Sequence, residues 1–268
     1  MAARAVHLLG LRTTEAADLV PPGPANPSGF WESRRMNRHN EYLLRCVGST
    51  WCHPPPTDDF VGALSPYGSI LTSRAEFFRV HHSAQWVWKE PRLCITLPWW
   101  RKALPEIRLA VLMVRNPLEC ASSSTAALGL DLDWGLALWE SHTHRAISAL
   151  AGMPALVSTY QTVRDSPMEW CDQLASTLTV MNVNLSATWR ADLRDFVTAN
   201  RYAFAEGWQR RVPLELVDHW TQLRRLEGMH WAFQPPPIPP ESSWTRQVLA
   251  QRRLAAASTY LKELRQRT

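Results

Sequence analysis

The chain has 268 residues, of which 46% are hydrophobic and 20% are charged, and this composition excludes a disordered chain and indicates a globular protein with a full core. The formal net charge of +5 suits an anionic ligand such as a nucleotide, whereas no basic run or groove-reading motif indicates nucleic acid. The five cysteines form no C-x-x-C pair and no apolar stretch reaches about 18 residues. We therefore expect reduced thiols in a cytoplasmic protein, without a zinc site and without a transmembrane segment.

The first third of the chain is predicted to alternate helices with loops. Residues 1–10 have the pattern of a helix end that stops at Gly10. An apolar stripe predicts a helix over 33–47, and a further helix is expected over 69–80. Loops rich in proline are predicted at 20–30 and 48–67.

The middle of the chain is predicted to alternate strands with helices. Residues 86–88, Trp-Val-Trp, form a short strand candidate, and 108–114, RLAVLMV, form the clearest strand. Because 108–114 is apolar almost throughout, we expect both of its faces to be buried, as in a parallel sheet. A third strand is expected at 155–159. Helices are predicted at 93–103, 117–128, 132–150 and 166–179.

This order of elements predicts an α/β fold with a parallel sheet and crossover helices. The last third is helical and rich in tryptophan, and it ends in a helix over about 243–265 with Ser242 or Ser243 as its N-cap. Because we find no repeat and no linker, we expect one domain over 1–268. The 14 tryptophans are better explained as core residues than as the lining of a groove.

The segment VLMVRNPLECASSS at 111–124 carries the main chemical signal. Arg115 directly follows the predicted strand, at the carboxyl end of the sheet, where open α/β folds bind their ligands. Ser123 lies eight residues later, about two turns into the next helix. A guanidinium and a hydroxyl can together hold a phosphate monoester. The alternative is a surface ion-pair partner and an ordinary small helix residue.

Four blocks of sequence resemble sulfotransferases that use 3′-phosphoadenosine 5′-phosphosulfate. The Arg-x-Pro segment with its later serine resembles their 3′-phosphate-binding segment. Two further blocks resemble segments of a bacterial sulfotransferase-like group: Asn26-Pro27-x-Gly29-Phe30-Trp31-Glu32, and Lys89-Glu90-Pro91-Arg92-Leu93 with Glu90 in place of an aspartate. The fourth block resembles the strand end and turn that follow the 3′-phosphate motif, and it consists of Val157-Ser158-Thr159-Tyr160 and the later Asp165-Ser166-Pro167. All four blocks follow the expected order. The resemblance covers about residues 1–180 and implies a P-loop NTPase-like parallel sheet flanked by helices, with a helical C-terminal part.

The resemblance also implies a role for each matching residue. Arg115 and Ser123 would hold the 3′-phosphate, and Tyr160 would lie near the adenine unless it is only a buried residue at the strand end. Lys89 would neutralise charge on the transferring sulfuryl group or the leaving phosphate, or else be a surface lysine. Glu32 would act as the general base on the acceptor hydroxyl, or else be a helix N-terminal charge favoured by the helix dipole. We expect no metal in this reaction.

One element of the family has no match in the sequence. The first strand and the glycine-containing loop that cradles the 5′-phosphosulfate are missing, and residues 2–10 resemble the helix that normally follows that loop. The sequence therefore predicts a chain truncated at its N-terminus, either because its start was assigned about twenty residues too late or because the loop was lost. The late arginine that other members supply for the 3′-phosphate also has no clear match, and Arg201 and Arg210 are candidates by position alone.

These observations favour an enzyme that moves a sulfuryl group to a hydroxyl or amine of a small molecule, glycan or lipid. The alternative is a truncated, inactive relative that binds the nucleotide or a partner without turnover. A P-loop kinase is a weaker third hypothesis, because no G-x-x-x-x-G-K-[ST] occurs in the chain. The identity of the acceptor and the oligomeric state cannot be predicted from these residues.

Overall fold

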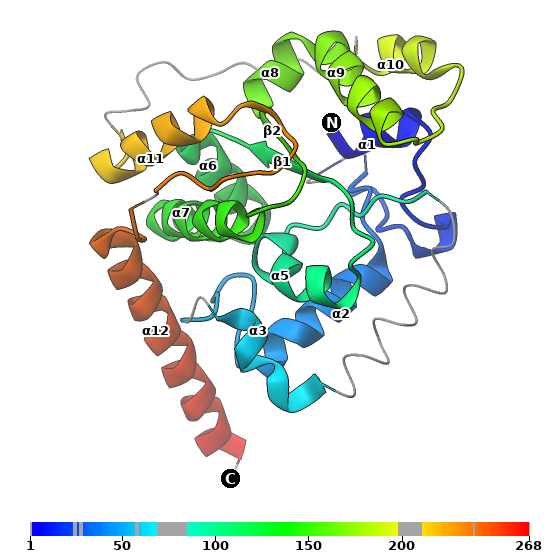
Figure 1. Ribbon diagram of the computed structural model, residues 1–268. Coiled ribbons are helices and arrows are strands. Elements are labelled where there is room, and N and C mark those ends of the chain that lie inside the picture. Colours follow the sequence, from blue (N-terminus) through cyan, green and yellow to red (C-terminus); the bar gives the residue numbers. More distant parts are fainter. Residues whose placement is uncertain are drawn as a thin grey trace.

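The computed structural model describes residues 2–23, 26, 29–56, 59–68, 85–197, 211–237 and 239–267, with the backbone alone for 195–197 and 260–267. Helices dominate the described part, and three strands form one small sheet (Figure 1). The strands are β1 (Ala110–Val114), β2 (Ala155–Thr159) and β3 (Gly228–His230). The α-helices are α1 (Ala2–Leu8), α2 (Arg34–Cys46), α3 (Phe60–Ala63), α5 (Leu93–Ala103), α6 (Pro117–Leu128), α7 (Leu132–Ala149), α8 (Tyr160–Asp165), α9 (Pro167–Val180), α10 (Trp189–Val197), α11 (Leu214–Arg225) and α12 (Ser243–Arg267). Two short 3-10 turns, η1 (Ala16–Asp18) and η2 (Ser65–Tyr67), lie in the first third.

The sheet is mixed, so the prediction of a purely parallel sheet was wrong. β1 and β2 pair in parallel from Ala110–Ala155 to Val114–Thr159, as expected for strands joined by crossover helices. β3 pairs with β2 in the antiparallel direction. The three residues Gly-Met-His are too few to show an alternating pattern, so this strand could not be predicted from the sequence.

Helices cover both faces of the sheet, and the alternation of side chains along β2 shows this directly. Ala155 and Val157 belong to a core cluster with residues of α6, α7 and α11, whereas Leu156 belongs to a second cluster with residues of α1, α9 and α10 (Figure 1). All five residues of β2 are buried. In β1 only Val114 is buried and the other four residues are half-buried.

The half-buried state of β1 corrects the expectation that both faces of 108–114 would be fully buried. The strand begins at Ala110, and in the sheet order β1-β2-β3 it lies at an edge of the described sheet. Its side chains contact both core clusters, with Leu112 on one side and Val111 and Met113 on the other, and these three residues remain partly accessible to solvent.

The prediction of a short strand at 86–88 was also wrong. In the structure Trp86 makes a single parallel bridge with Arg12, closed by Val87 N donating to Arg12 O at 2.8 Å. A Trp-Val-Trp run favours extended backbone, but a strand also needs a neighbour of matching length. The helix expected over 69–80 lies outside the described residues.

Most of the predicted helices are confirmed, and their ends have local causes. Ser33 caps α2 by accepting from Met36 N, and Ser242 caps α12 by accepting from Thr245 N. Gly10 ends the first helix region with a φ of 105°, a backbone conformation that glycine adopts easily. The helices expected at 93–103, 117–128, 132–150 and 166–179 match α5, α6, α7 and α9 to within two residues.

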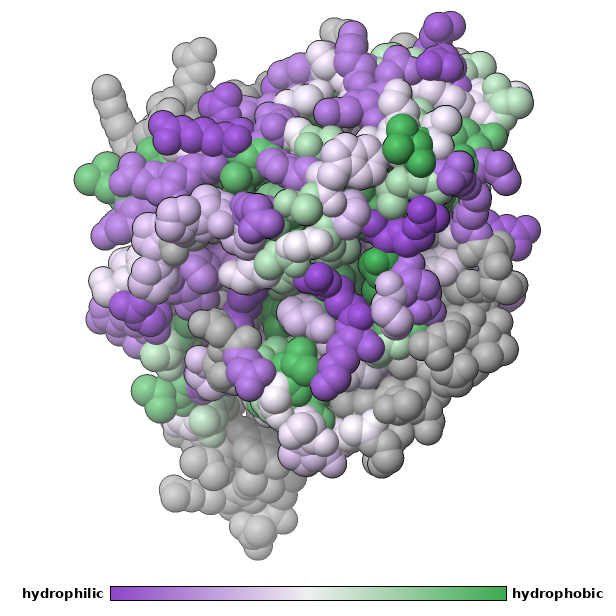
Figure 2. Space-filling model, viewed as in Figure 1, coloured by the Kyte–Doolittle hydropathy of each residue, from purple (hydrophilic) through white to green (hydrophobic). Residues whose placement is uncertain are grey.

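The surface on the side shown in Figure 2 mixes hydrophilic residues with small, scattered hydrophobic ones. α12 leaves the body of the molecule toward the C-terminus (Figure 1), and Leu254 on it is 71% exposed. No helix within the described ranges is both long enough and apolar enough to cross a bilayer.

Candidate functional site

Two predicted site residues meet at the carboxyl edge of the sheet. Val114 and Thr159 are paired in register, so the residues that follow them, Arg115 and Tyr160, leave neighbouring strands at the same point. The guanidinium carbon of Arg115 lies 4.7 Å from the centre of the Tyr160 ring, within the range of a cation–π contact. The structure therefore brings a fixed positive charge and an aromatic surface together where α/β folds bind ligands.

Arg115 is held by its neighbours but remains partly open to solvent. Its Nε donates to Oε2 of Glu119, in the first turn of α6, at 3.0 Å, and its side chain is 36% exposed. Its main-chain oxygen accepts from Trp139 Nε1 at 2.8 Å. The guanidinium is thus oriented by an ion pair and a ring, and it still presents surface that an anion can reach.

The first turn of α6 has its own cap. Asn116 Oδ1 accepts from Leu118 N at 3.0 Å and from Glu119 N at 3.3 Å, and Pro117 has no N–H to satisfy. Ser123 lies on the same helix and is exposed. No described contact joins Ser123 to Arg115, so their joint phosphate site stays a prediction.

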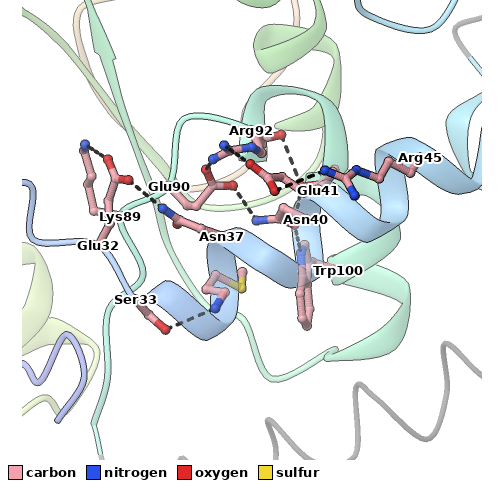
Figure 3. Close-up of polar contacts among 12 residues, drawn as sticks. Glu32, Ser33, Asn37, Asn40, Glu41, Arg45, Lys89, Glu90, Arg92 and Trp100 are labelled. Carbon is pink, nitrogen blue, oxygen red and sulfur yellow. Dashed lines mark hydrogen bonds and ion pairs between the residues drawn. The ribbon is translucent and has the colours of Figure 1, made fainter. Parts of the chain in front are cut away.

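The second group of predicted residues pairs Glu32 with Lys89 (Figure 3). Glu32 precedes the N-cap of α2, and its Oε1 forms an ion pair with the Lys89 ammonium. Its other oxygen, Oε2, accepts from Asn37 Nδ2 at 2.9 Å. The Glu32 side chain is only 9% exposed, whereas that of Lys89 is 39% exposed. Lys89 is thus a partly exposed partner of Glu32, and the Glu32 carboxylate is fixed through both oxygens.

A buried polar layer lies next to this pair (Figure 3). The Glu90 side chain is 0% exposed and accepts from Asn40 Nδ2 and from Arg92, each at 2.5 Å. Arg92 also pairs with Glu41 at 2.7 Å. Burial raises the pKa of Glu90, and the positive charge of Arg92 opposes this shift. Asn40 completes the layer because its Oδ1 accepts from Trp100 Nε1 at 2.8 Å.

The contacts of four residues in this region were not predicted from the sequence: Asn37, Asn40, Glu90 and Arg92. Asn37 and Asn40 lie three positions apart on α2, a spacing that places both on one helix face, and this was the available signal. Glu90 and Arg92 stood in the block that marks the resemblance, but no function had been assigned to them.

The two groups rest on different elements. Arg115 and Tyr160 stand at the ends of β1 and β2, whereas Glu32 and Lys89 join the start of α2 to the segment before α5. The late-chain candidates Arg201 and Arg210 lie outside the described residues. Among the residues that are described, no three His, Cys, Asp or Glu side chains gather in a way that could hold a metal ion.

Chemically, the first group can bind an anion through the partly exposed guanidinium of Arg115, beside the ring of Tyr160. The second group can hold a carboxylate and an ammonium in place for proton transfer or charge neutralisation. Searches of protein-family models, of curated proteins and of solved structures found no match to this chain.

Proposed function

We propose that the protein is a sulfotransferase that moves a sulfuryl group from 3′-phosphoadenosine 5′-phosphosulfate to a hydroxyl or amine. The observation that carries the proposal is the meeting of Arg115 with Tyr160 at the carboxyl ends of two parallel strands, 4.7 Å from guanidinium to ring. A nucleotide that bears a 3′-phosphate offers both an anion and an aromatic base. Ser123, on the exposed surface of α6, is proposed as the second phosphate ligand.

In the proposed reaction Glu32 acts as the base. The acceptor O–H gives its proton to the Glu32 carboxylate, and the acceptor oxygen forms a bond to sulfur while the bond from sulfur to the 5′-phosphate oxygen breaks. The products are the sulfated acceptor and 3′-phosphoadenosine 5′-phosphate. Lys89 neutralises the negative charge that builds up on the leaving phosphate, since its ammonium adjoins Glu32 and is partly exposed. Such a transfer depends mainly on in-line positioning and charge stabilisation.

We also propose a P-loop NTPase-like arrangement for the sheet. Two features support it: the parallel pairing of β1 with β2 and the helices α6 and α7 that connect them. β3 departs from this arrangement because it runs antiparallel to β2.

A second candidate is a protein that binds the nucleotide without turnover. The ion pair between Glu32 and Lys89 favours it, because that carboxylate already accepts from an ammonium and from Asn37, and an acceptor hydroxyl would have to displace one of these partners. In this case Arg115 and Tyr160 would bind the nucleotide, while Glu32 and Lys89 would only connect two segments of the chain.

The test is calorimetric titration with 3′-phosphoadenosine 5′-phosphate. It is made on the 268-residue chain. Arg115→Ala should weaken binding by about 1.5–3 kcal/mol, the range for a charge-assisted hydrogen bond. The matched control is Arg190→Ala, because Arg190 also stacks on a ring, at 4.4 Å from Trp189, and pairs with Asp172 at 2.6 Å. Equal affinity of the Arg115 variant and the control would refute the nucleotide site.

Glu32→Gln then separates the two candidates. An enzyme should lose turnover of 3′-phosphoadenosine 5′-phosphosulfate and keep its affinity for the desulfated nucleotide. A protein that only binds the nucleotide should show no acceptor-dependent release of 3′-phosphoadenosine 5′-phosphate, either as the wild type or as Glu32→Gln.

A further inference from the structure

A run of prolines joins β3 to α12. The segment 234–240 has the sequence QPPPIPP, and Figure 1 shows its described part in orange between these two elements. The described residues of the run, 234–237, 239 and 240, belong to no helix or strand. A proline ring fixes its own φ at about −65° and restricts the preceding residue to extended backbone. The run therefore favours a polyproline II helix, which has three residues per turn.

Exposure along the run follows this period of three. The edge that is exposed at each of its positions consists of Gln234, Pro237 and Pro240. Each of the other two edges includes a half-buried proline, Pro235 on one and Pro236 on the other, and Pro239 adds an exposed ring beside Pro240. One edge of the run, with two proline rings, thus faces solvent along its length, while the other two edges lie partly against the protein.

Both ends of the run are fixed to the body of the protein. Before the run, Phe233 is fully buried, and its N donates to Met153 O at 3.0 Å. After the run, Ser242 Oγ donates to Glu140 Oε2 on α7 at 2.7 Å. Because the ends are fixed and the prolines are stiff, the run has little conformational entropy to lose when it binds a partner, and this favours affinity.

An earlier triple proline, at 54–56, shows how the chain binds a proline run within the fold. Pro54 and Pro55 are buried, and their main-chain oxygens accept from Arg253 Nη2 at 2.6 Å and from Arg145 Nη2 at 2.8 Å. In the run at 234–240, by contrast, none of the described residues takes part in a described hydrogen bond. The later run therefore has proline rings and carbonyl oxygens that a second protein can contact.

We propose that the exposed prolines of this run, Pro237, Pro239 and Pro240, bind a partner protein whose groove is lined by aromatic side chains. Grooves of this kind, as in WW domains and Src-homology-3 domains, recognise preformed polyproline II helices. The ten residues at 231–240 include no Asp, Glu, Lys, Arg or His. The partner must therefore recognise proline rings and carbonyl oxygens rather than charges. This interaction lies outside the proposed nucleotide chemistry.

The experiment adds the unlabelled 268-residue protein to an isolated WW domain and to an isolated Src-homology-3 domain, each labelled with ¹⁵N and observed by NMR. We expect saturable shifts of the aromatic groove signals in at least one of the two domains. The affinity should change by less than about twofold between about 50 and 500 mM NaCl, because salt screens only charged contacts. The absence of a saturable shift in both domains, or a steep loss of affinity with salt, would overturn the proposal.

A double variant tests the location of the surface. Pro237→Ala with Pro240→Ala removes both rings from the exposed edge, and it should weaken the affinity for the responding domain at least about tenfold. The matched control is Pro21→Ala with Pro22→Ala. These two prolines are also exposed, but their loop turns back at 23–26 and is not extended. The control should leave the affinity unchanged.

A measurement of stability separates binding from a structural role. Because Pro237 and Pro240 are exposed, the double variant should unfold in urea at about the same midpoint as the control. Equal affinity of the double variant and the control would show that the exposed edge is not the contact surface. A lowered midpoint with unchanged affinity would make the run a structural connection between β3 and α12, and either result would overturn the proposal.

Discussion

The two halves of the proposed site, Glu32 with Lys89 and Arg115 with Tyr160, differ in how closely their side chains are bound by neighbouring residues. The Glu32 side chain is 9% exposed, and its carboxylate is bound through both oxygens (Figure 3). Its partner Lys89 is followed in the chain by Glu90, whose side chain is fully buried. Arg115 is 36% exposed and is held by one described ion pair and one ring. The first half is an internally neutralised unit, and the second is a charge that still has room for a ligand.

This difference indicates separate roles. Groups that are already positioned and paired need little rearrangement during a reaction, which is the property expected of groups that act on a transition state. A half-exposed guanidinium can exchange a carboxylate partner for a phosphate, which is the property expected of a binding residue. We therefore expect the two halves to differ in their contribution to stability as they differ in burial.

The largest expected effect is the loss of stability when the buried layer is broken. Glu90→Ala leaves Arg92 and Asn40 without their shared carboxylate, and removing one partner of a buried ion pair costs about 3–5 kcal/mol. Because the Arg92 side chain keeps 20% exposure, we expect the lower end of that range, about 3 kcal/mol, in the free energy of unfolding measured with urea.

The matched control for Glu90→Ala lies in the other half of the site. Glu119→Ala removes the carboxylate from the Arg115 pair, and we expect a loss below about 1 kcal/mol because that pair is partly exposed to solvent. Similar losses in the two variants would contradict the distinction between the two halves.

A smaller effect is expected in the pH dependence of stability. Burial raises the pKa of Glu90 above its ordinary value of 4.5, so the folded chain holds this proton more tightly than the unfolded chain. The contribution is therefore fully present below about pH 4.5 and is lost as the pH rises through the folded pKa, at about 1.4 kcal/mol for each unit of difference.

Glu90→Gln removes this titration while it keeps the size of the side chain. The stability of the wild type relative to Glu90→Gln should fall as the pH rises from 4.5, as measured by urea unfolding at a series of pH values. A difference that stays constant with pH, or that grows with rising pH, would show that Glu90 is not held in a raised-pKa environment.

The helices could be predicted where the pattern that specifies them lies within the helix or next to its ends. α2, α5, α6 and α7 follow from apolar periodicity and from caps such as Ser33, which lie within a few residues of the helix. β3 and the segment 86–88 were not predictable, because pairing depends on which distant segment lies alongside and three residues carry no period.

The candidate site shows the same limit. Arg115 and Tyr160 could be expected to meet, because the ends of neighbouring parallel strands lie at one edge of a sheet. Asn40 could not be recognised from its type, since an asparagine on a helix usually faces solvent, whereas here it is completely buried and binds Glu90. Its burial depends on Trp100 and on a segment fifty residues away, which no local pattern contains.

The smallest expected effect concerns the pair between Arg115 and Glu119. A phosphate that binds Arg115 must share the guanidinium with the Glu119 carboxylate, whose negative charge opposes the approach of an anion. Glu119→Gln removes that charge, so affinity for 3′-phosphoadenosine 5′-phosphate should increase by about 0.5–1 kcal/mol, the usual strength of an exposed ion pair, which is about two- to fivefold. Asp172→Asn, which releases Arg190 from a more exposed pair away from the proposed nucleotide site, should leave the affinity unchanged. Weaker binding by Glu119→Gln would mean that Glu119 orients the guanidinium for the ligand, and the open half of the site would then be as firmly built as the other.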